Sequence, residues 1–301
     1  MVYDCIIAGA GPAGLSAAIY ACRFGHSVCI IEPLAPGGQL MYIDRIENYP
    51  ASPSVSGFAL ADALQQQAEG FGAKIVYDEV TGINKAEGIF SVTCSSGSYQ
   101  AKTVIIATGA THRKLGIMGE DRFEGRGVSY CATCDGPFYR GKDVIVVGGG
   151  DTALTEALYL SGLCKTVKLI HRRDTFRAQE LLVKRVNEAE NISLVMNHTL
   201  TSVNGDDKVT SVTLDDGSEV SCDGLFIFAG ILPSSQPFAD SLKTDAQGFI
   251  ITDERLETSV KGIYAAGDVR TTPFRQVVTA ASDGALAAFS VHEYISEVNN
   301  H

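Results

Sequence analysis

Asp4-Cys5-Ile6-Ile7-Ala8-Gly9-Ala10-Gly11-Pro12-Ala13-Gly14 is a segment that the chain repeats. A similar segment, Asp143-Val144-Ile145-Val146-Val147-Gly148-Gly149-Gly150-Asp151-Thr152-Ala153, follows 139 positions later. Each copy has a short apolar run, a glycine-rich turn and a helix start made of small residues. Second apolar runs, at 28–31 and 167–170, keep the same offset. The repeat therefore predicts two β-α-β units of one kind, and with them an α/β fold.

Both turns read G-x-G-x-x-G/A, which lets the backbone turn tightly and approach a pyrophosphate at the N-terminus of the following helix. A single motif of this kind is weak support, because glycines also serve packing. Two copies, each between a strand and a helix, favour two dinucleotide sites. The expected contacts are Gly9, Gly11, Pro12, Ala13 and Gly14 in the first turn, and Gly148, Gly150, Asp151, Thr152 and Ala153 in the second.

The ends of the second apolar runs carry opposite charges. Glu32 stands at the end of the first, whereas His171 stands at the same place in the second and is followed by Arg172, Arg173 and Arg177. A carboxylate accepts ribose hydroxyls, and arginines bind a 2′-phosphate. Two unit charges about 4 Å apart interact by roughly 4 kcal/mol at an effective dielectric constant of 20. We therefore expect FAD at the first site and NADPH at the second; a solvated basic helix start is the alternative.

Shortly before the second copy lies Cys131-Ala132-Thr133-Cys134-Asp135, which holds the only C-x-x-C pair. Such a pair is half of a metal site, a redox disulfide or a structural crosslink. Four-coordinate zinc needs two more ligands at matching spacing, and the other six cysteines stand alone, so no metal site is expected. The neighbouring nucleotide loop favours the redox alternative.

Composition limits the partners and the compartment. The net charge of -11 over 301 residues argues against nucleic acid or an anionic membrane surface as partner. Residues 5–22 carry no charge, but glycines and Pro12 interrupt them, and no basic segment typical of a secretory signal precedes them. We expect a cytoplasmic protein that does not span a membrane.

Several further motifs accompany the repeat and the cysteine pair. They are Gly37-Gly38-Gln39-Leu40, Glu47-Asn48-Tyr49-Pro50, Ala107-Thr108-Gly109-Ala110, 171–177, 262–268 and Arg275-Gln276. Together and in this order the motifs resemble those of the low-molecular-weight, bacterial-type thioredoxin reductases, a family of class II pyridine nucleotide-disulfide oxidoreductases. The similarity runs from residue 4 to about residue 295.

The resemblance implies two Rossmann-like, three-layer ββα domains, one inserted into the other. The FAD domain would comprise 1–113 and 241–301, and the NADPH domain 114–240 with the cysteine pair. It also implies a homodimer with thioredoxin as the protein partner. Further FAD contacts implied by the family are Gly38, Gln39, Leu40, Asn48, Thr108, Gly109, Gly267, Asp268, Arg275, Gln276 and Val277.

NADPH gives up a hydride whereas a disulfide is reduced through thiolates, so a flavin is the natural converter between them. By the family's order, Cys134 faces the flavin and Cys131 attacks the substrate. Asp135 is expected to be the acid or base, although a carboxylate that only favours a helix dipole is the alternative. Since the cysteine pair and the NADPH loop must both meet one flavin, we expect the NADPH domain to rotate.

Other functions remain open at this point. One is an NADPH-dependent flavin reductase of another thioredoxin-like protein or of a peroxidase system. The reductase of a peroxidase system carries an N-terminal thioredoxin-like extension, and we expect a chain that starts at the first nucleotide strand to lack it. A dithiol oxidase would not need the arginines after His171. A flavoprotein that serves only as a scaffold and has no catalytic activity would not need the cysteine pair.

Overall fold

The computed structural model describes residues 1–43, 45–52, 54–86 and 88–299. The chain forms two compact units, one made of Met1–Thr111 and Leu232–His301, the other of His112–Ile231. We call them unit 1 and unit 2 and describe each by itself. Among the described residues, no helix combines the length and the apolar character needed to cross a membrane.

Unit 1 is built on a seven-stranded sheet in the order β3-β2-β1-β6-β5-β4, with β17 also paired to β6. The first three strands, β6 and β17 are parallel, and β4 and β5 are antiparallel additions. The bounds are β1 (Val2–Ala8), β2 (Val28–Glu32), β3 (Lys74–Tyr77), β4 (Val80–Ala86), β5 (Ile89–Cys94), β6 (Ser98–Ile106) and β17 (Ile263–Ala265).

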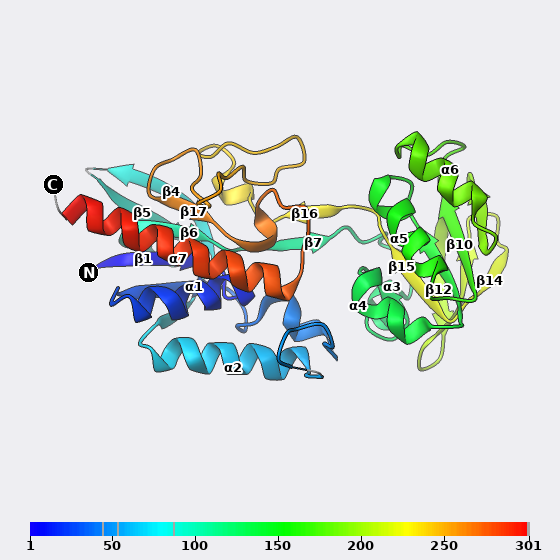
Figure 1. Cartoon of the computed structure of the whole chain (residues 1–301), viewed down its shortest axis with the longest axis horizontal. Helices are drawn as coiled ribbons and strands as arrows, with labels where there is room; N and C mark the ends of the chain where they lie inside the picture. The colour runs from blue at the N-terminus through cyan, green and yellow to red at the C-terminus, as the bar shows by residue number, and fades with distance from the viewer. Residues whose placement is uncertain (44, 53, 87, 300–301) are drawn as a thin grey trace. The chain divides into compact units, whose positions relative to one another are not determined.

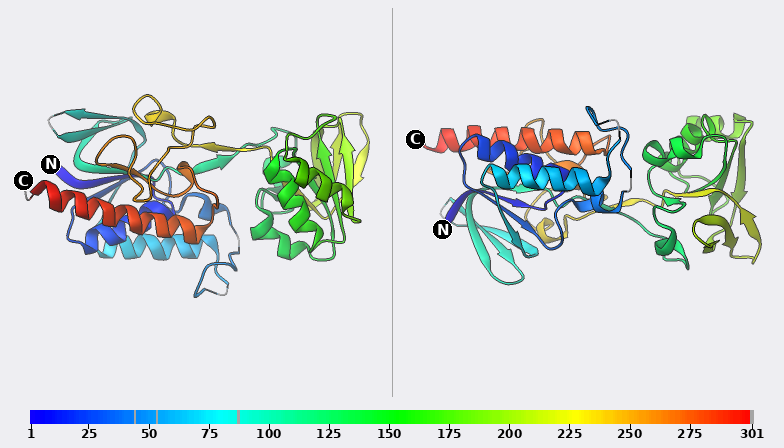
Figure 2. Two further views of the ribbon diagram at one scale, coloured as in Figure 1. Left: turned by 45° about the horizontal axis from the view of Figure 1, so that its top comes forward. Right: turned by 90° about the horizontal axis from the view of Figure 1, so that it is seen from below.

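Alternate residues of β1 face two different layers of unit 1. Cys5 and Ile7 are buried beside α1 (Pro12–Arg23) and α7 (Val277–Asn299). Ile6 and Ala8 are buried on the other face, in a cluster with residues of β4 and β5 such as Phe90. Figures 1 and 2 show α1, α7 and α2 (Gly57–Gly70) running side by side on one face of the sheet. The period of two along β1 thus builds a three-layer unit.

Unit 2 repeats this plan. Its parallel sheet has the order β11-β10-β9-β15-β8, which matches β3-β2-β1-β6-β17 of unit 1 strand for strand. The bounds are β8 (Val128–Ser129), β9 (Asp143–Val147), β10 (Thr166–His171), β11 (Ile192–Met196) and β15 (Gly224–Ile227).

Here too, alternate residues of the central strand face two layers. Val144 and Val146 are buried with α5 (Asp151–Ser161) and α6 (Glu180–Glu188). Ile145 faces the antiparallel strands β12 (Leu200–Gly205), β13 (Val209–Leu214) and β14 (Glu219–Ser221). The prediction of an α/β fold with two Rossmann-like units is confirmed.

The chain crosses between the units in two paired strands, β7 (Ala110–His112) and β16 (Ile231–Pro233). The first boundary, after Thr111, lies close to the expected residue 113. The second lies after Ile231 rather than at 240/241, because Phe238 and Leu242 are buried in the core of unit 1. The segment between β16 and residue 241 therefore belongs to unit 1.

Candidate active site

The first glycine-rich turn has an open face at the start of α1. Gly9 has a φ of +104°, and a Cβ there would lie 2.4 Å from the carbonyl oxygen of Ala107. Gly11 precedes the helix and has no side chain to cap it. Among the described residues, nothing lies within 4 Å of a Cβ at Gly11. The uncapped N–H groups of the first helical turn and this free space fit a pyrophosphate.

The second turn has the same form. Gly148 has a φ of +154°, and a Cβ there would lie 2.5 Å from the Cβ of Ala153 and 2.7 Å from the carbonyl oxygen of Phe228. Gly150 precedes α5, and the described chain again leaves the space beside its Cα open to 4 Å. Asp151 accepts a hydrogen bond from the Gln179 N–H at 2.7 Å, which ties the helix start to the segment before α6. The backbone of both glycine-rich turns can therefore accommodate the pyrophosphates that the sequence predicts there.

The side chain of Glu32, at the end of β2, is hydrogen-bonded to the backbone of the first glycine-rich turn. Its Oε2 accepts from the Ala10 N–H at 2.8 Å, and its Oε1 accepts from the Leu34 N–H at 3.1 Å. Each carboxylate oxygen keeps a further lone pair. Glu32 thus shapes the loop and can also accept a ribose hydroxyl.

His171, at the end of β10, packs its ring against the second turn. A Cβ at Gly149 would lie 2.1 Å from its Cε1 atom. Burial lowers the pKa of His171, and the nearby positive charges of Arg172, Arg173 and Arg177 lower it further, so the ring is neutral at pH 7. The three arginines are exposed. They are accessible to a phosphate, whereas the histidine has a packing role.

The turn η4 (Gly267–Val269) lies against the first loop of unit 1. Gly267 has a φ of +76°, and a Cβ there would lie 2.9 Å from the Cβ of Ala13. Burial raises the pKa of Asp268, Arg275 opposes this shift, and Asp283 adds to it. The sequence-predicted Gly267 is thus brought to the glycine-rich turn, and Asp268 follows it in the same short helix.

The turn is held by two residues that the sequence analysis did not name. Asp283 of α7 accepts from the Gly267 N–H at 3.0 Å and from Arg270 Nε at 2.8 Å, and its other oxygen accepts from Arg270 Nη2 at 3.1 Å. Both side chains are largely buried. No local pattern marks this pair, because its members become neighbours only when α7 packs on the sheet.

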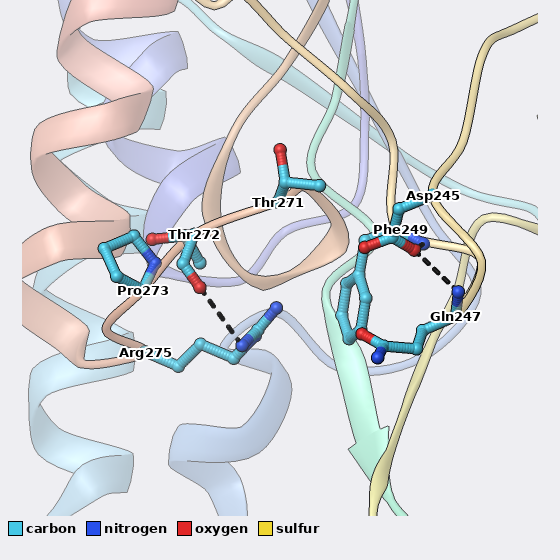
Figure 3. Close-up of a pocket in the computed structure, with 7 residues that line it drawn as sticks. All are labelled: Asp245, Gln247, Phe249, Thr271, Thr272, Pro273 and Arg275. Carbon is cyan, nitrogen blue, oxygen red and sulfur yellow. Dashed lines mark hydrogen bonds between the residues drawn. The ribbon is translucent and has the colours of Figure 1, made fainter. Parts of the chain in front are cut away.

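Arg275 borders a cavity of about 400 Å³ that is lined by Asp245, Gln247, Phe249, Thr271, Thr272, Pro273 and Arg275. Its guanidinium lies 4.2 Å from the centre of the Phe249 ring, and Nη1 donates to the Thr272 carbonyl at 3.3 Å (Figure 3). Within the described part of the chain, its buried Nε has no hydrogen-bond partner. A buried donor without an acceptor fits a cofactor oxygen or nitrogen.

The other predicted FAD positions fall into two groups. Gln39 donates to the Ala110 carbonyl at 2.6 Å, Asn48 donates to Gln276 at 3.0 Å, and Thr108 donates to the Ser234 carbonyl at 2.7 Å. Gly38 lies beside the first loop, and Gly109 has a φ of +72°. By contrast, the side chain of Leu40 is buried with Ile46 and Ala61, and Val277 packs on the same cluster. Leu40 therefore has a packing role in this fold.

Cys131 and Cys134 form a disulfide at α4 (Ala132–Asp135), between β8 and the short helix η2 (Gly136–Tyr139). Cys131 precedes the helix, and its Sγ accepts from the Cys134 N–H at 3.2 Å. The bond closes a loop within one turn, so it removes little chain entropy and does not crosslink the fold. Across the described residues, no three or more His, Cys, Asp or Glu side chains gather to hold a metal.

Asp135 joins the disulfide to the sheet. Its Oδ2 accepts from the hydroxyl of Ser129, at the end of β8, at 2.5 Å. Burial raises the pKa of Asp135, and the Ser129 hydrogen bond opposes that shift. A carboxyl group with a raised pKa beside a disulfide is suited to act as a general acid or base. Ser129 was missed by the sequence analysis, and its position two residues before Cys131 is the only signal that could have found it.

Comparisons with known proteins agree with this geometry. A family model described as pyridine nucleotide-disulphide oxidoreductase matches residues 3–284. The thioredoxin reductase of Treponema pallidum is 52% identical over 305 residues, with 99% of each chain covered. That of Listeria innocua is 44% identical, covering 99% of this chain and 95% of the relative. The crystal structure of thioredoxin reductase from Streptococcus pyogenes superimposes with a TM-score of 0.95 at 42% identity, covering 98% of this chain and 99% of that one.

Proposed function

We propose a function from one premise: this chain belongs to the pyridine nucleotide-disulphide oxidoreductase family. It is an oxidoreductase and a flavoprotein that uses FAD and NADPH, and it reduces the disulfide of thioredoxin. The observation that carries this function is the combination, in one chain, of two open phosphate loops with a disulfide beside a largely buried carboxyl group. The full-length thioredoxin reductase relatives favour thioredoxin as substrate over a peroxidase system.

The residues of unit 1 are assigned to FAD. The first loop would hold the pyrophosphate, Glu32 the adenosine ribose, and Asp268 the ribityl side. The buried Nε of Arg275 and the amide pair of Asn48 and Gln276 would face the flavin. Held by these residues, FAD would supply the redox chemistry that links hydride donation by NADPH to two-electron reduction of the disulfide.

The residues of unit 2 are assigned to NADPH and to the disulfide chemistry. The second loop would hold the pyrophosphate of NADPH, and the exposed Arg172, Arg173 and Arg177 its 2′-phosphate. Neutral His171 fixes the loop by packing on Gly149. These assignments explain why the chain should prefer NADPH to NADH.

The reduced cysteine pair carries the electrons to the substrate. Cys131 as a thiolate attacks one substrate sulfur, the substrate disulfide breaks, and a mixed disulfide forms. Cys134 then attacks the Cys131 sulfur, which restores the enzyme disulfide and leaves the substrate with two reduced sulfurs. In each of the two steps Asp135 takes up the proton that ionises the attacking cysteine, Cys131 and then Cys134, and gives it to the substrate thiolate that departs, so the carboxyl group ends each step in the state in which it began.

Unit 2 should rotate about β7 and β16 during turnover, since the NADPH loop and the disulfide both belong to it and both must reach one flavin. A disulfide engineered between the units should stop turnover and leave one half-reaction intact. The single-cysteine versions of the same protein are the control. Full turnover in the crosslinked protein would disprove the rotation.

We further propose that the protein acts in the cytoplasm as a homodimer, without a nucleic acid or membrane partner. The net charge of -11 supports the absence of polyanionic partners. Sedimentation equilibrium should give twice the mass of the chain.

The function is tested by following NADPH oxidation coupled to oxidised thioredoxin. Cys131→Ser should abolish thioredoxin reduction while NADPH still bleaches the flavin, and NADH should be a poor donor. Cys22→Ser, at a lone half-buried cysteine of unit 1, is the control and should keep full activity. Thioredoxin reduction by the Cys131→Ser protein would refute the assignment of the attacking sulfur.

A further inference from the structure

Ser129 lies on the sheet and yet contacts the reactive turn. It ends β8, pairs in register with Phe226 of β15 and is 5% exposed. The cysteine pair sits on the one-turn helix α4 that follows. Because the strand is buried, it can hold the Ser129 hydroxyl in a fixed position relative to the turn that carries the reactive cysteines.

The hydroxyl has three polar neighbours. Its Oγ lies 2.5 Å from Asp135 Oδ2, accepts from the Cys131 N–H at 3.1 Å, and lies 3.3 Å from the Cys131 carbonyl oxygen. A serine has one hydrogen and two lone pairs, so it can donate either to Asp135 or to the carbonyl, but not to both. The protonation state of Asp135 decides which.

When Asp135 is ionised, it needs the hydrogen of Ser129. When Asp135 is protonated, it can donate its own hydrogen to the serine oxygen, and the serine hydrogen is free to turn to the Cys131 carbonyl. The same carbonyl also accepts from the Asp135 N–H at 3.1 Å. The two states of the carboxyl group therefore give two different sets of hydrogen bonds around the Cys131 peptide.

We propose that Ser129 is a positioning residue of the disulfide exchange: it holds the Asp135 carboxyl group at the cysteine pair and couples its protonation to the backbone of Cys131. The proposal rests on the proposed function in one respect, that Asp135 supplies the proton to the leaving thiolate. In that step the carboxyl O–H bond breaks, a sulfur–hydrogen bond forms, and the carboxylate that remains takes the Ser129 hydrogen bond. No electron passes through the serine.

The pH dependence caused by Asp135 must be distinguished from that of other titratable groups near it. Tyr139 of η2 interacts with Asp135, and burial raises its pKa to about 12, so it does not titrate near neutral pH. On α5, which packs against α4, Tyr159 faces Gly136, and Glu156 is a half-buried carboxyl group. Burial raises the pKa of Glu156 as well. A Glu156→Gln variant therefore belongs in the test.

The test uses the holoenzyme reduced with dithiothreitol and two small disulfides. 2-Hydroxyethyl disulfide releases an alkyl thiolate of high pKa, which needs a proton, whereas 5,5′-dithiobis(2-nitrobenzoate) releases an aryl thiolate that leaves unaided. Ser129→Ala should slow the alkyl disulfide about fivefold and leave the aryl disulfide within about twofold. It should also move to higher pH the limb on which the alkyl reaction slows as Asp135 loses its proton, because the serine favours the ionised carboxyl group.

Three further variants serve as controls for this proposal. Ser129→Thr keeps a hydroxyl and should restore the limb. Ser161→Ala removes a hydroxyl whose hydrogen bond, within the described residues, goes to the Leu158 carbonyl alone, and Glu156→Gln removes the other carboxyl group. The last two should leave the limb unchanged. Equal slowing of both disulfides by Ser129→Ala, or an unmoved limb, overturns the proposal. Because no NADPH or thioredoxin takes part, a failure here is distinct from a failure of the proposed function.

Discussion

The two glycine-rich turns share their backbone and differ in the side chain that closes them. In unit 1 the Gly9 N–H donates to the Ile31 carbonyl at 2.8 Å, and in unit 2 the Gly148 N–H donates to the Ile170 carbonyl at 3.2 Å. Both pairs stand at the offset of the repeat. Each sheet thus presents its loop by the same hydrogen bonds.

The difference appears at two linked positions of the repeat. Glu32 reaches the Ala10 N–H with a carboxylate oxygen and leaves room for the alanine methyl group. At the equivalent place in unit 2 the His171 ring occupies the space of a Cβ, so position 149 has to be glycine. The residue at the strand end therefore limits which residue fits in the loop. These two linked positions show how one fold can be adapted to two nucleotides.

The largest effect should come from exchanging the residue at the third glycine position of the motif, which is Gly14 in unit 1 and Ala153 in unit 2. A Cβ at Gly14 would lie 1.9 Å from the Gly9 carbonyl oxygen, whereas Ala153 already stands at this place in unit 2. Gly14→Ala should lower the free energy of unfolding by about 3 kcal/mol, because backbone must move, and should abolish FAD binding. Ala153→Gly should cost only about 1 kcal/mol.

The two variants are compared by urea unfolding and by flavin absorbance of the purified protein. Normal flavin content in Gly14→Ala would contradict the close approach of loop and helix in unit 1.

The next effect concerns the charges that follow β10. Replacing Arg172 and Arg173 by glutamine should raise the KM for NADPH about 100-fold, roughly tenfold for each charge removed, and leave the KM for NADH nearly unchanged. Steady-state assays with both coenzymes measure the split. Arg185→Gln, on α6, is the matched control and should behave as the parent protein. An equal rise for both coenzymes would mean that these arginines do not select the 2′-phosphate.

A smaller effect tests the link between positions 149 and 171. Gly149→Ala should destabilise the protein by about 2 kcal/mol, since the methyl group meets the His171 ring. In the background of His171→Ala the same change should cost little. A double-mutant cycle on the free energies of unfolding measures this coupling. Additive costs would show that the ring is not the obstacle.

The smallest effect is the pH dependence that His171 gives to unit 2. Burial first, and then the arginine charges, lower its pKa in the folded state, so the unfolded chain binds more protons. Its contribution to stability is present above the ordinary histidine pKa of about 6.5 and is lost as the pH falls through the lower folded value. Urea unfolding between pH 7 and 5 should show a shallower loss for His171→Ala than for the parent protein. A steeper loss would refute the neutral, packed ring.

Much of the fold could be read from the sequence because its signals are local. Apolar runs, the glycine spacing and the constant offset predicted both β-α-β units. The C-x-x-C spacing, together with the nucleotide loop that follows it, favoured the redox disulfide, and the structure contains this disulfide. The second domain boundary was placed too late, because nothing near Pro233 marks the return of the chain. Whether Phe238 belongs to unit 1 or unit 2 depends on which core it fills, and that is not a local property.

The two glycine-rich loops, the charge difference between Glu32 and the arginines, and the cysteine pair follow from the amino-acid sequence alone, because each needs only neighbours along the chain. The distant groups that support them are known only from the packing of the folded chain. Asp283 reaches η4 only because α7 packs on the sheet, and Ser129 meets Asp135 only because β8 ends beside α4. Hydrogen bonds of this kind depend on distances of about 3 Å between elements, and the pattern of a sequence does not contain those distances.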